Sequence, residues 1–291
     1  MPNCVCDIQS GMESNLRTLG PNESRLILSL AEDNREIVSA AEAIDLLGSE
    51  TTARSVIRSL VRKGWLTRLV GGRYMVLPSS HGPENIGENN ALALASAAVE
   101  ASYVGWWSAA SFHGMTTQCP RQTMVAVLKQ RDKVTIEGHI VRFVQVAPRK
   151  FFGFAPFEIY GRNARLSTPA KTVIDCVDRP ALAGGPSEVA RIVFGASRSV
   201  EAAEMIADAL RMQSQSLLQR LGFLAELVGW PLSEADRVQL RAAIAPSARS
   251  TFGRKDRQPD DIGYVSEWGL FVHANERDLL ADVPSPYPGA R

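Results

Sequence analysis

A chain of 291 residues is long enough for two domains that each bury a core, because domains usually span ~100–200 residues. Its 45% hydrophobic and 22% charged residues are typical of a soluble globular protein. The net charge of +1 indicates no partner by itself, so charge has to be compared segment by segment. No apolar run reaches the ~18 residues of a membrane span, which excludes a membrane-spanning protein.

The N-terminal residues 1–14 have neither the basic start nor the apolar stretch of a signal peptide. We therefore expect a cytoplasmic protein with a disordered leader, in which Met12 is an alternative start. The four cysteines lack the spacing of zinc ligands: Cys4, Cys6, Cys119 and Cys176. Because a cytosolic chain rarely carries structural disulfides, we expect four plain thiols, two of them buried, and no metal.

Signals for three short helices follow within the first eighty residues. Pro21-Asn22 predicts the start of a helix whose inner side carries Leu26, Ile27 and Leu30. A capping box of Ser39 and Glu42 predicts a second helix, which ends at Gly48 and buries Ala43, Ile44 and Leu47. A third helix, capped by Ser49 or Thr51, runs to Lys63-Gly64. Two short helices joined by a tight glycine turn predict a helix-turn-helix.

The third predicted helix has an apolar face and a basic face. At 100° per residue the inner arc carries Ala53, Val56, Ile57, Leu60 and Val61. The opposite arc carries three arginines and three hydroxyls: Arg54, Arg58, Arg62, Thr51, Ser55 and Ser59. Arginines suit guanine edges and phosphates, and hydroxyls suit either. A plain solvated face is the alternative, but between Glu50 and Pro78 six basic side chains face one acidic one, a balance of +5.

A β-hairpin is predicted directly after the basic helix. Residues 65–70 and 73–78 form its strands, and Gly71-Gly72 supplies the positive φ angles of a two-residue turn. Helix, helix, basic helix and hairpin in this order predict a winged helix-turn-helix over residues 1–80, which binds double-stranded DNA. The predicted DNA contacts are Thr51, Thr52, Arg54, Ser55, Arg58, Arg62, Lys63, Arg68 and Arg73, with the last two near the tip of the hairpin.

The remaining chain predicts a polar linker over 81–90, in the stretch SSHGPENIGENN, and a second domain over 91–291. Helices are expected at 91–101, at 106–113 and after Thr168-Pro169, and strands at 123–128, 140–146 and 157–160. Residues 186–245 read as helical, with a buried leucine-rich segment at 217–227. Trp268 and Phe271 are expected to anchor the polar tail. The predicted fold class is α+β: a winged helix-turn-helix, then a larger mixed α/β part, then an all-helical C-terminal domain.

No catalytic set emerges from the sequence, so we expect neither enzyme activity nor a cofactor. The four histidines lack ligand spacing: His81, His113, His139 and His273. Ser108 and Ser111 lack a nucleophile elbow, and Gly184-Gly185 lacks the context of a phosphate-binding loop. Trp106-Trp107 and Phe151-Phe152 are expected to pack in the core or between domains. Asp175 and Asp178, near Lys171 and Arg179, are expected to form a surface ion network.

The chain resembles the AbiEi antitoxins of type IV toxin–antitoxin systems, over roughly residues 20 to 230. The resemblance lies in RSLVRKGWLTRLVGGRYMVLP of the winged helix, YVGWWSAASFHGM (103–115), FFG (151–153), STPAKTVIDCVDRPALAGG (167–185) and QRLGFLAEL (219–227). It implies motif residues in the C-terminal domain: Trp107, Ser108, His113, Lys171, Thr172, Asp175 and Arg220. One position departs from the family, since Ala170 stands where the family usually has a glutamate.

The resemblance implies a repressor that binds inverted repeats upstream of its own two-gene operon. It also implies that the C-terminal domain counters a nucleotidyltransferase-type toxin without a stable complex. The residues alone support only DNA binding by the first domain. Two alternatives remain: a ligand-sensing transcriptional regulator without a toxin, whose middle part holds an effector pocket, and, more remotely, an enzyme with a DNA-targeting domain.

Overall fold

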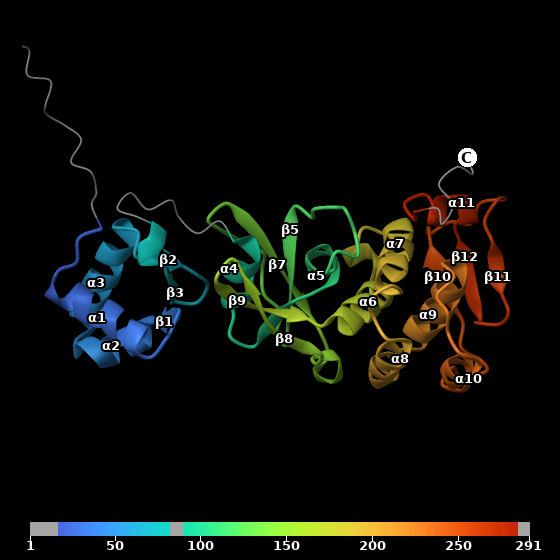
Figure 1. Cartoon of the computed structure of the whole chain (residues 1–291), viewed down its shortest axis with the longest axis horizontal. Helices are drawn as coiled ribbons and strands as arrows, with labels where there is room; N and C mark the ends of the chain where they lie inside the picture. Colours follow the sequence, from blue (N-terminus) through green and yellow to red (C-terminus); the bar gives the residue numbers. More distant parts are fainter. Residues whose placement is uncertain (1–16, 82–89, 285–291) are drawn as a thin grey trace, which may run out of the picture. The chain divides into compact units, whose positions relative to one another are not determined.

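The computed structural model describes residues 17–81 and 90–284 (Figure 1). The chain divides into two compact units, one of residues 1–99 with 136–138 and the other of residues 100–135 with 139–291. The predicted leader and most of the predicted linker lie outside the described residues. The division places helix α4 (Ala91–Ala97) in the first unit, although the sequence prediction began the second domain at residue 91.

Three helices of the first unit enclose a small apolar core, and they match the predicted ones: α1 (Pro21–Glu32), α2 (Ala40–Leu47) and α3 (Glu50–Arg62). The capping box at α2 is confirmed, because Ser39 Oγ accepts from the Glu42 amide and the Glu42 carboxylate accepts from the Ser39 amide. Ser49, rather than Thr51, caps α3. The core is formed around Leu26, Leu30, Ala43, Ile57 and Leu60, all buried.

A three-stranded antiparallel sheet completes this unit in the order β1-β3-β2: β1 (Ile37–Ser39), β2 (Leu66–Arg68) and β3 (Arg73–Val76). The sequence indicated β2 and β3 but not β1, whose three residues pair with β3 across the sheet. A single-turn helix, η1 (Ser79–His81), follows.

A six-stranded sheet begins the second unit, in the order β6-β7-β5-β4-β9-β8. Its strands are β4 (Ser102–Val104), β5 (Gln122–Val127), β6 (Val134–Ile136), β7 (His139–Gln145), β8 (Phe154–Ile159) and β9 (Arg162–Ser167). The three predicted strands correspond to β5, β7 and β8. The pairs of β5 with β7 and of β4 with β9 are parallel, whereas the pairs of β4 with β5 and of β8 with β9 are antiparallel.

Helix α6 (Pro169–Asp178) is the centre of the second unit, because α5 (Trp106–Phe112) and three later helices all contact it (Figure 1). These are α7 (Pro186–Ala196), α8 (Ala202–Arg211) and α9 (Gln215–Leu227), and α10 (Glu234–Ala242) packs against α8 and α9. Short turns η2 (Pro148–Lys150) and η3 (Pro180–Leu182) flank α6 in the sequence. Every residue of α6 from Ala170 to Val177 is buried, so no face of it is left for solvent.

The prediction of an all-helical C-terminal part is wrong beyond α10. A second three-stranded sheet follows, in the order β10-β12-β11, with a last helix after it: β10 (Ser250–Gly253), β11 (Gly263–Val265), β12 (Leu270–His273) and α11 (Glu276–Leu279). The strands have only three or four residues each and no continuous alternation, so their amino-acid pattern carries little strand signal. Trp268 is fully buried as an anchor, whereas Phe271 remains 41% exposed.

Within the described residues, no helix is both long and apolar enough to cross a membrane. Of the four cysteines, two of which were expected to be buried, Cys176 is buried and Cys119 is exposed, while Cys4 and Cys6 lie outside the described residues.

We predict that Gly222→Ala destabilises the protein through Trp268. A Cβ at Gly222 would overlap the indole ring, which cannot move aside because it is buried and its Nε1 donates to Glu226 at 2.8 Å. Such overpacking costs about 1–3 kcal/mol. Thermal or denaturant unfolding measures this loss. In a Trp268→Leu background the same change should become stabilising by about 0.5–1 kcal/mol, through helix propensity. An equal loss in both backgrounds would contradict the explanation.

Candidate nucleic-acid interface

The outer face of α3 presents the cationic side chains that the sequence predicted. Arg54, Arg58 and Arg62 are exposed, as are Thr51 and Ser55, while Thr52 is half-buried. The inner face buries Ala53, Val56, Ile57 and Leu60. Val61 was predicted to point inward, but it is 37% exposed and lies at the margin of the apolar arc. The helix thus offers a row of three arginines spaced by one turn.

One arginine of this row pairs with Glu50, the single acidic residue counted between Glu50 and Pro78. Arg54 Nη2 lies 2.5 Å from Glu50 Oε1 one helical turn earlier. Both side chains are more than half exposed. An exposed pair of this kind contributes only ~0.3–0.5 kcal/mol, so a phosphate or a guanine edge can displace the carboxylate at little cost.

Lys63 is engaged more firmly, at the end of α3. Its ammonium lies 2.6 Å from the carboxylate of Glu23, which is almost buried and also accepts from the Gly20 amide. Burial acts to raise the pKa of Glu23, but the Gly20 amide and Lys63 together hold it below its ordinary value. This pair joins α3 to the start of α1. Lys63 therefore has a structural partner in addition to the DNA contact predicted for it.

The hairpin between β2 and β3 turns through Gly71 and Gly72, whose φ angles of +68° and +73° favour glycine. Arg68 is exposed on β2, and its backbone pairs with Tyr74 of β3. Arg73 is only half-buried, in register with Ser39 of β1. Of the two predicted hairpin contacts, Arg68 is therefore the more accessible.

Arg17 fixes the base of this hairpin. Its guanidinium donates to the carbonyls of Leu77 and Pro78 at 3.1 and 2.8 Å and stacks 4.0 Å from the ring centre of Trp65. The Trp65 Nε1–H donates in turn to the Arg17 carbonyl at 3.0 Å. No local pattern in the sequence marked Arg17, because its partners lie 48 to 61 residues away.

The motif residues of the second unit centre on the buried ammonium of Lys171. It is fully buried, pairs with the Asp175 carboxylate and donates to Tyr103 Oη at 3.1 Å. Tyr103 Oη also donates to Asp175 Oδ2 at 3.2 Å. Burial raises the pKa of Asp175, although the Lys171 charge opposes this, and burial beside Asp175 raises the pKa of Tyr103 well above its usual value.

Gly153 of the FFG motif makes room for this lysine. Its φ is +66°, and a Cβ there would lie 3.0 Å from the Cβ and Cγ atoms of Lys171. Ala170, at the position of the family's usual glutamate, is fully buried in the apolar core. The charged partner of Lys171 in this chain is Asp175, one turn along the same helix.

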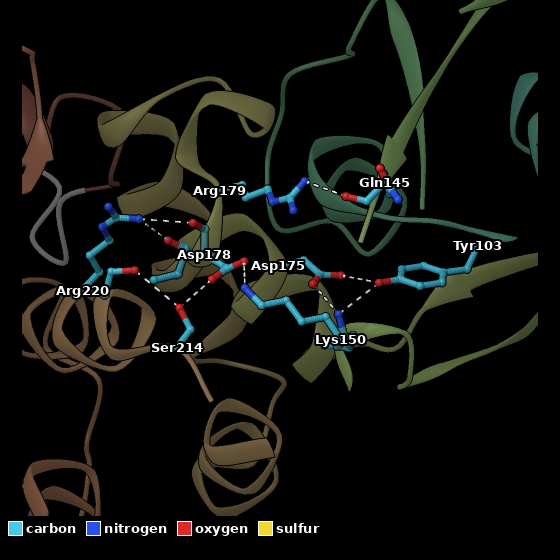
Figure 2. Close-up of polar contacts among 11 residues, drawn as sticks. Tyr103, Gln145, Lys150, Asp175, Asp178, Arg179, Ser214 and Arg220 are labelled. Atoms are coloured by element: carbon cyan, nitrogen blue, oxygen red, sulfur yellow. Dashed lines mark hydrogen bonds and ion pairs between the residues drawn. The ribbon is translucent and has the colours of Figure 1, made fainter. Parts of the chain in front are cut away.

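A second polar cluster lies at the C-terminal end of α6 (Figure 2). Asp178 accepts from Lys150 at 2.6 Å and from Ser214 Oγ at 2.9 Å. Arg220 Nη1 donates to the Asp178 carbonyl at 3.2 Å, and its Nη2 donates to the Thr251 carbonyl at 3.0 Å. Burial lowers the pKa of Arg220. This guanidinium ties the end of α6 to α9 and β10.

These contacts overturn the expectation of a surface ion network around Asp175 and Asp178. Asp175 is buried, Asp178 binds Lys150 rather than Lys171, and Arg179 donates instead to the Gln145 carbonyl at 3.1 Å, as Figure 2 shows. A spacing of one helical turn was compatible with an exposed pair, but the surrounding sheet and helices cover this side of α6.

The other motif residues do not gather at one site. Their hydrogen bonds connect neighbouring helices and strands. His113 Nε2 donates to the Ser167 carbonyl at 2.8 Å, and burial lowers its pKa, which favours the neutral ring. Thr172 Oγ1 lies 2.6 Å from Ser167 Oγ. Ser108 Oγ accepts from the Met124 amide and so fixes α5 to β5. Trp107 Nε1 donates to Glu188 at 3.0 Å.

Tyr103 and Glu188 are polar partners that sequence reasoning missed, because each meets its motif residue only through the tertiary fold. Ser167 meets His113 in the same way, although it lies only five residues from Thr172. Nowhere in residues 17–81 and 90–284 do three metal-ligating side chains gather. The motif residues connect α5, α6 and α9 to neighbouring strands and helices.

Comparisons with known proteins match a separate family domain to each of the two units. Residues 25–69 match the family model described as a transcriptional regulator, AbiEi antitoxin, so the first unit contains a DNA-binding regulator domain. Residues 103–227 match the AbiEi antitoxin C-terminal domain. The chain belongs to the AbiEi antitoxin family, a family of regulators and antitoxins rather than of enzymes. The resemblance predicted from the sequence motifs is confirmed.

Among solved structures, the crystal structure of the RV2827C protein from Mycobacterium tuberculosis is similar. Its TM-score is 0.62 at 18% sequence identity, over 91% of this chain and 95% of that chain. At this identity the likeness shows the fold alone. No curated protein matches the chain.

Proposed function

We propose that this protein is the antitoxin of a type IV toxin–antitoxin system and represses its own operon in the cytoplasm. In this proposal the first unit is a winged helix-turn-helix that places α3 in the major groove of an inverted-repeat operator. The second unit counters a nucleotidyltransferase-type toxin, without a stable complex between the two proteins.

The observation that supports DNA binding best is the exposed face of α3. None of its three arginines is held by a buried carboxylate among the described residues. Glu50, which pairs with Arg54, is itself exposed. The helix packs against α1 and α2 through its apolar side, which leaves the arginine side to enter a groove. The hairpin that follows carries Arg68 within the same unit, where a wing reaches the flanking phosphates.

We expect the hairpin arginines to act on phosphates rather than on bases. Arg68→Ala should weaken binding to operator and random DNA alike, and should reduce the slope of log K against log salt by about one unit for each lost contact. Arg73→Ala should have a smaller effect, because Arg73 is half-buried. Fluorescence anisotropy at several salt concentrations measures both slopes. A loss confined to the operator would instead assign Arg68 to base contacts.

The antitoxin part of the proposal is tested by co-expression. The neighbouring toxin gene is placed under an independent promoter, so that repression cannot mimic rescue. Full-length protein should restore growth, and so should a full-length variant whose α3 arginines, Arg54 and Arg58, are changed to Ala. That variant separates neutralisation from DNA binding within one folded chain.

Failure of the full-length protein to restore growth, with its DNA binding intact, would contradict the antitoxin assignment. The ligand-sensing transcriptional regulator would then replace it. An overlapping downstream nucleotidyltransferase gene is the genomic arrangement that the antitoxin proposal expects.

A further inference from the structure

A hollow of about 650 Å³ lies beside strand β7 of the six-stranded sheet, next to the C-terminal end of α6. Strand β7 supplies one side, through Arg142 to Gln145, and the turn η3 supplies the other, with Arg179 just before it. Gln130, from the loop between β5 and β6, completes the rim. The size falls within the ~300–1,000 Å³ typical of small-molecule sites.

The polar groups that line this hollow are cationic or neutral. Arg142 is exposed and, among the described residues, has no carboxylate partner. Arg179 donates one N–H to the Gln145 carbonyl. The neighbouring carboxylate of Asp178 already accepts hydrogen bonds from Lys150 and Ser214. Arg142 and Arg179 therefore line the same space, and neither forms an ion pair within residues 17–81 and 90–284, a combination that suits a phosphate.

The loop that contributes Gln130 strengthens the positive field. It carries Lys129, Arg131 and Lys133, all exposed, against one acidic side chain, Asp132. The hollow also has an apolar component, since Val144 and Leu182 line it and are each only 8% exposed. A ligand with an anionic end and a flat, weakly polar end would use both features.

We propose that this hollow binds a nucleoside phosphate. The phosphates accept hydrogen bonds from Arg142 and Arg179, and the nucleoside covers Val144 and Leu182. The site lies within the second unit and involves neither the basic face of α3 nor Lys171. It gives the regulator a place to sense a small molecule, and it does not depend on the toxin partnership proposed above.

Isothermal titration calorimetry of the full-length chain tests the proposal, with each of the four ribonucleoside triphosphates and inorganic tripolyphosphate as probes. At least one nucleotide should bind at least tenfold more tightly than tripolyphosphate, because only the nucleotide covers the apolar floor. Arg142→Gln should weaken that binding about tenfold or more. Ala181→Glu, at an exposed lining position, should weaken it as strongly while removing no contact of the fold.

Arg121→Gln is the matched control, since Arg121 is exposed but does not line the hollow. It should bind like the parent. Absence of nucleotide binding, equal affinity for tripolyphosphate, or equal losses in Arg121→Gln and Arg142→Gln would each overturn the proposal. Random-sequence duplex DNA is measured in parallel. If Arg142→Gln weakens duplex binding while the parent binds no nucleotide, the hollow is a DNA contact instead.

Discussion

Replacing Lys171 by methionine should lower the free energy of unfolding by about 3–5 kcal/mol, as expected when one partner of a buried ion pair is removed. Asp175 would stay buried without its cation, and Tyr103 Oη would lose one of its two partners. Denaturant unfolding of the full chain measures the loss. The comparison variant is Lys150→Met, whose loss should be smaller because Asp178 keeps the Ser214 hydrogen bond and Lys150 is partly exposed.

The deficit of Lys171→Met should also depend on pH. Burial already raises the pKa of Asp175 in the folded protein, and without the ammonium nothing adjacent opposes that shift except the Tyr103 hydroxyl. Because the pKa of Asp175 is higher in the folded than in the unfolded protein, Asp175 stabilises the fold at a pH below its unfolded-state pKa. This stabilisation is lost as the pH rises through its folded-state pKa. The deficit should therefore be smaller at pH 5 than at pH 8.

A second change restores part of the stability if this explanation is correct. Lys171→Met combined with Asp175→Leu removes both charges and should be more stable than Lys171→Met alone. If the double variant is less stable than the single one, or if the deficit does not change with pH, the stability that Lys171 contributes does not come from its buried ion pair.

The sequence predicted what short-range chemistry determines. Ser39 and Glu42 satisfy each other's amides within one turn, and Gly71-Gly72 can adopt the required φ angles wherever the hairpin lies. The arginine row of α3 follows from helical spacing alone. These signals were sufficient for the three helices, the hairpin and the candidate DNA-binding face.

Features that depend on distant partners could not be predicted in the same way. Lys171 and Asp175 are spaced like an exposed surface pair, but the tertiary fold buries both beside Tyr103, which lies 68 residues from Lys171. The sheet of β10, β11 and β12 was missed because its strands have only three or four residues. The parallel pairing of β10 with β12 adds no hairpin signal, although β11 and β12 are antiparallel. Arg17 likewise gains its role only from tertiary contacts, and Glu23 adds a tertiary pair with Lys63 to its local hydrogen bond from the Gly20 amide.

Binding to the protein's own promoter DNA tests the central claim, that α3 reads the operator. Arg54→Ala and Arg58→Ala should each weaken binding by about 1–3 kcal/mol, or roughly 5- to 150-fold, since each is placed to contact a base edge. Random-sequence DNA should be affected less, so the preference for the operator falls. Arg58 is expected to show the larger loss, because Arg54 must first leave Glu50.

The decisive measurement is a titration of the double variant, Arg54→Ala with Arg58→Ala, on promoter and random DNA. The control is Arg25→Ala, which removes an exposed arginine from α1 in the same unit. Loss of the promoter preference in the double variant, with Arg25→Ala unchanged and unfolding curves alike, is the predicted result. Promoter binding by the double variant equal to that of the parent would contradict the assignment of α3 as the DNA-reading helix.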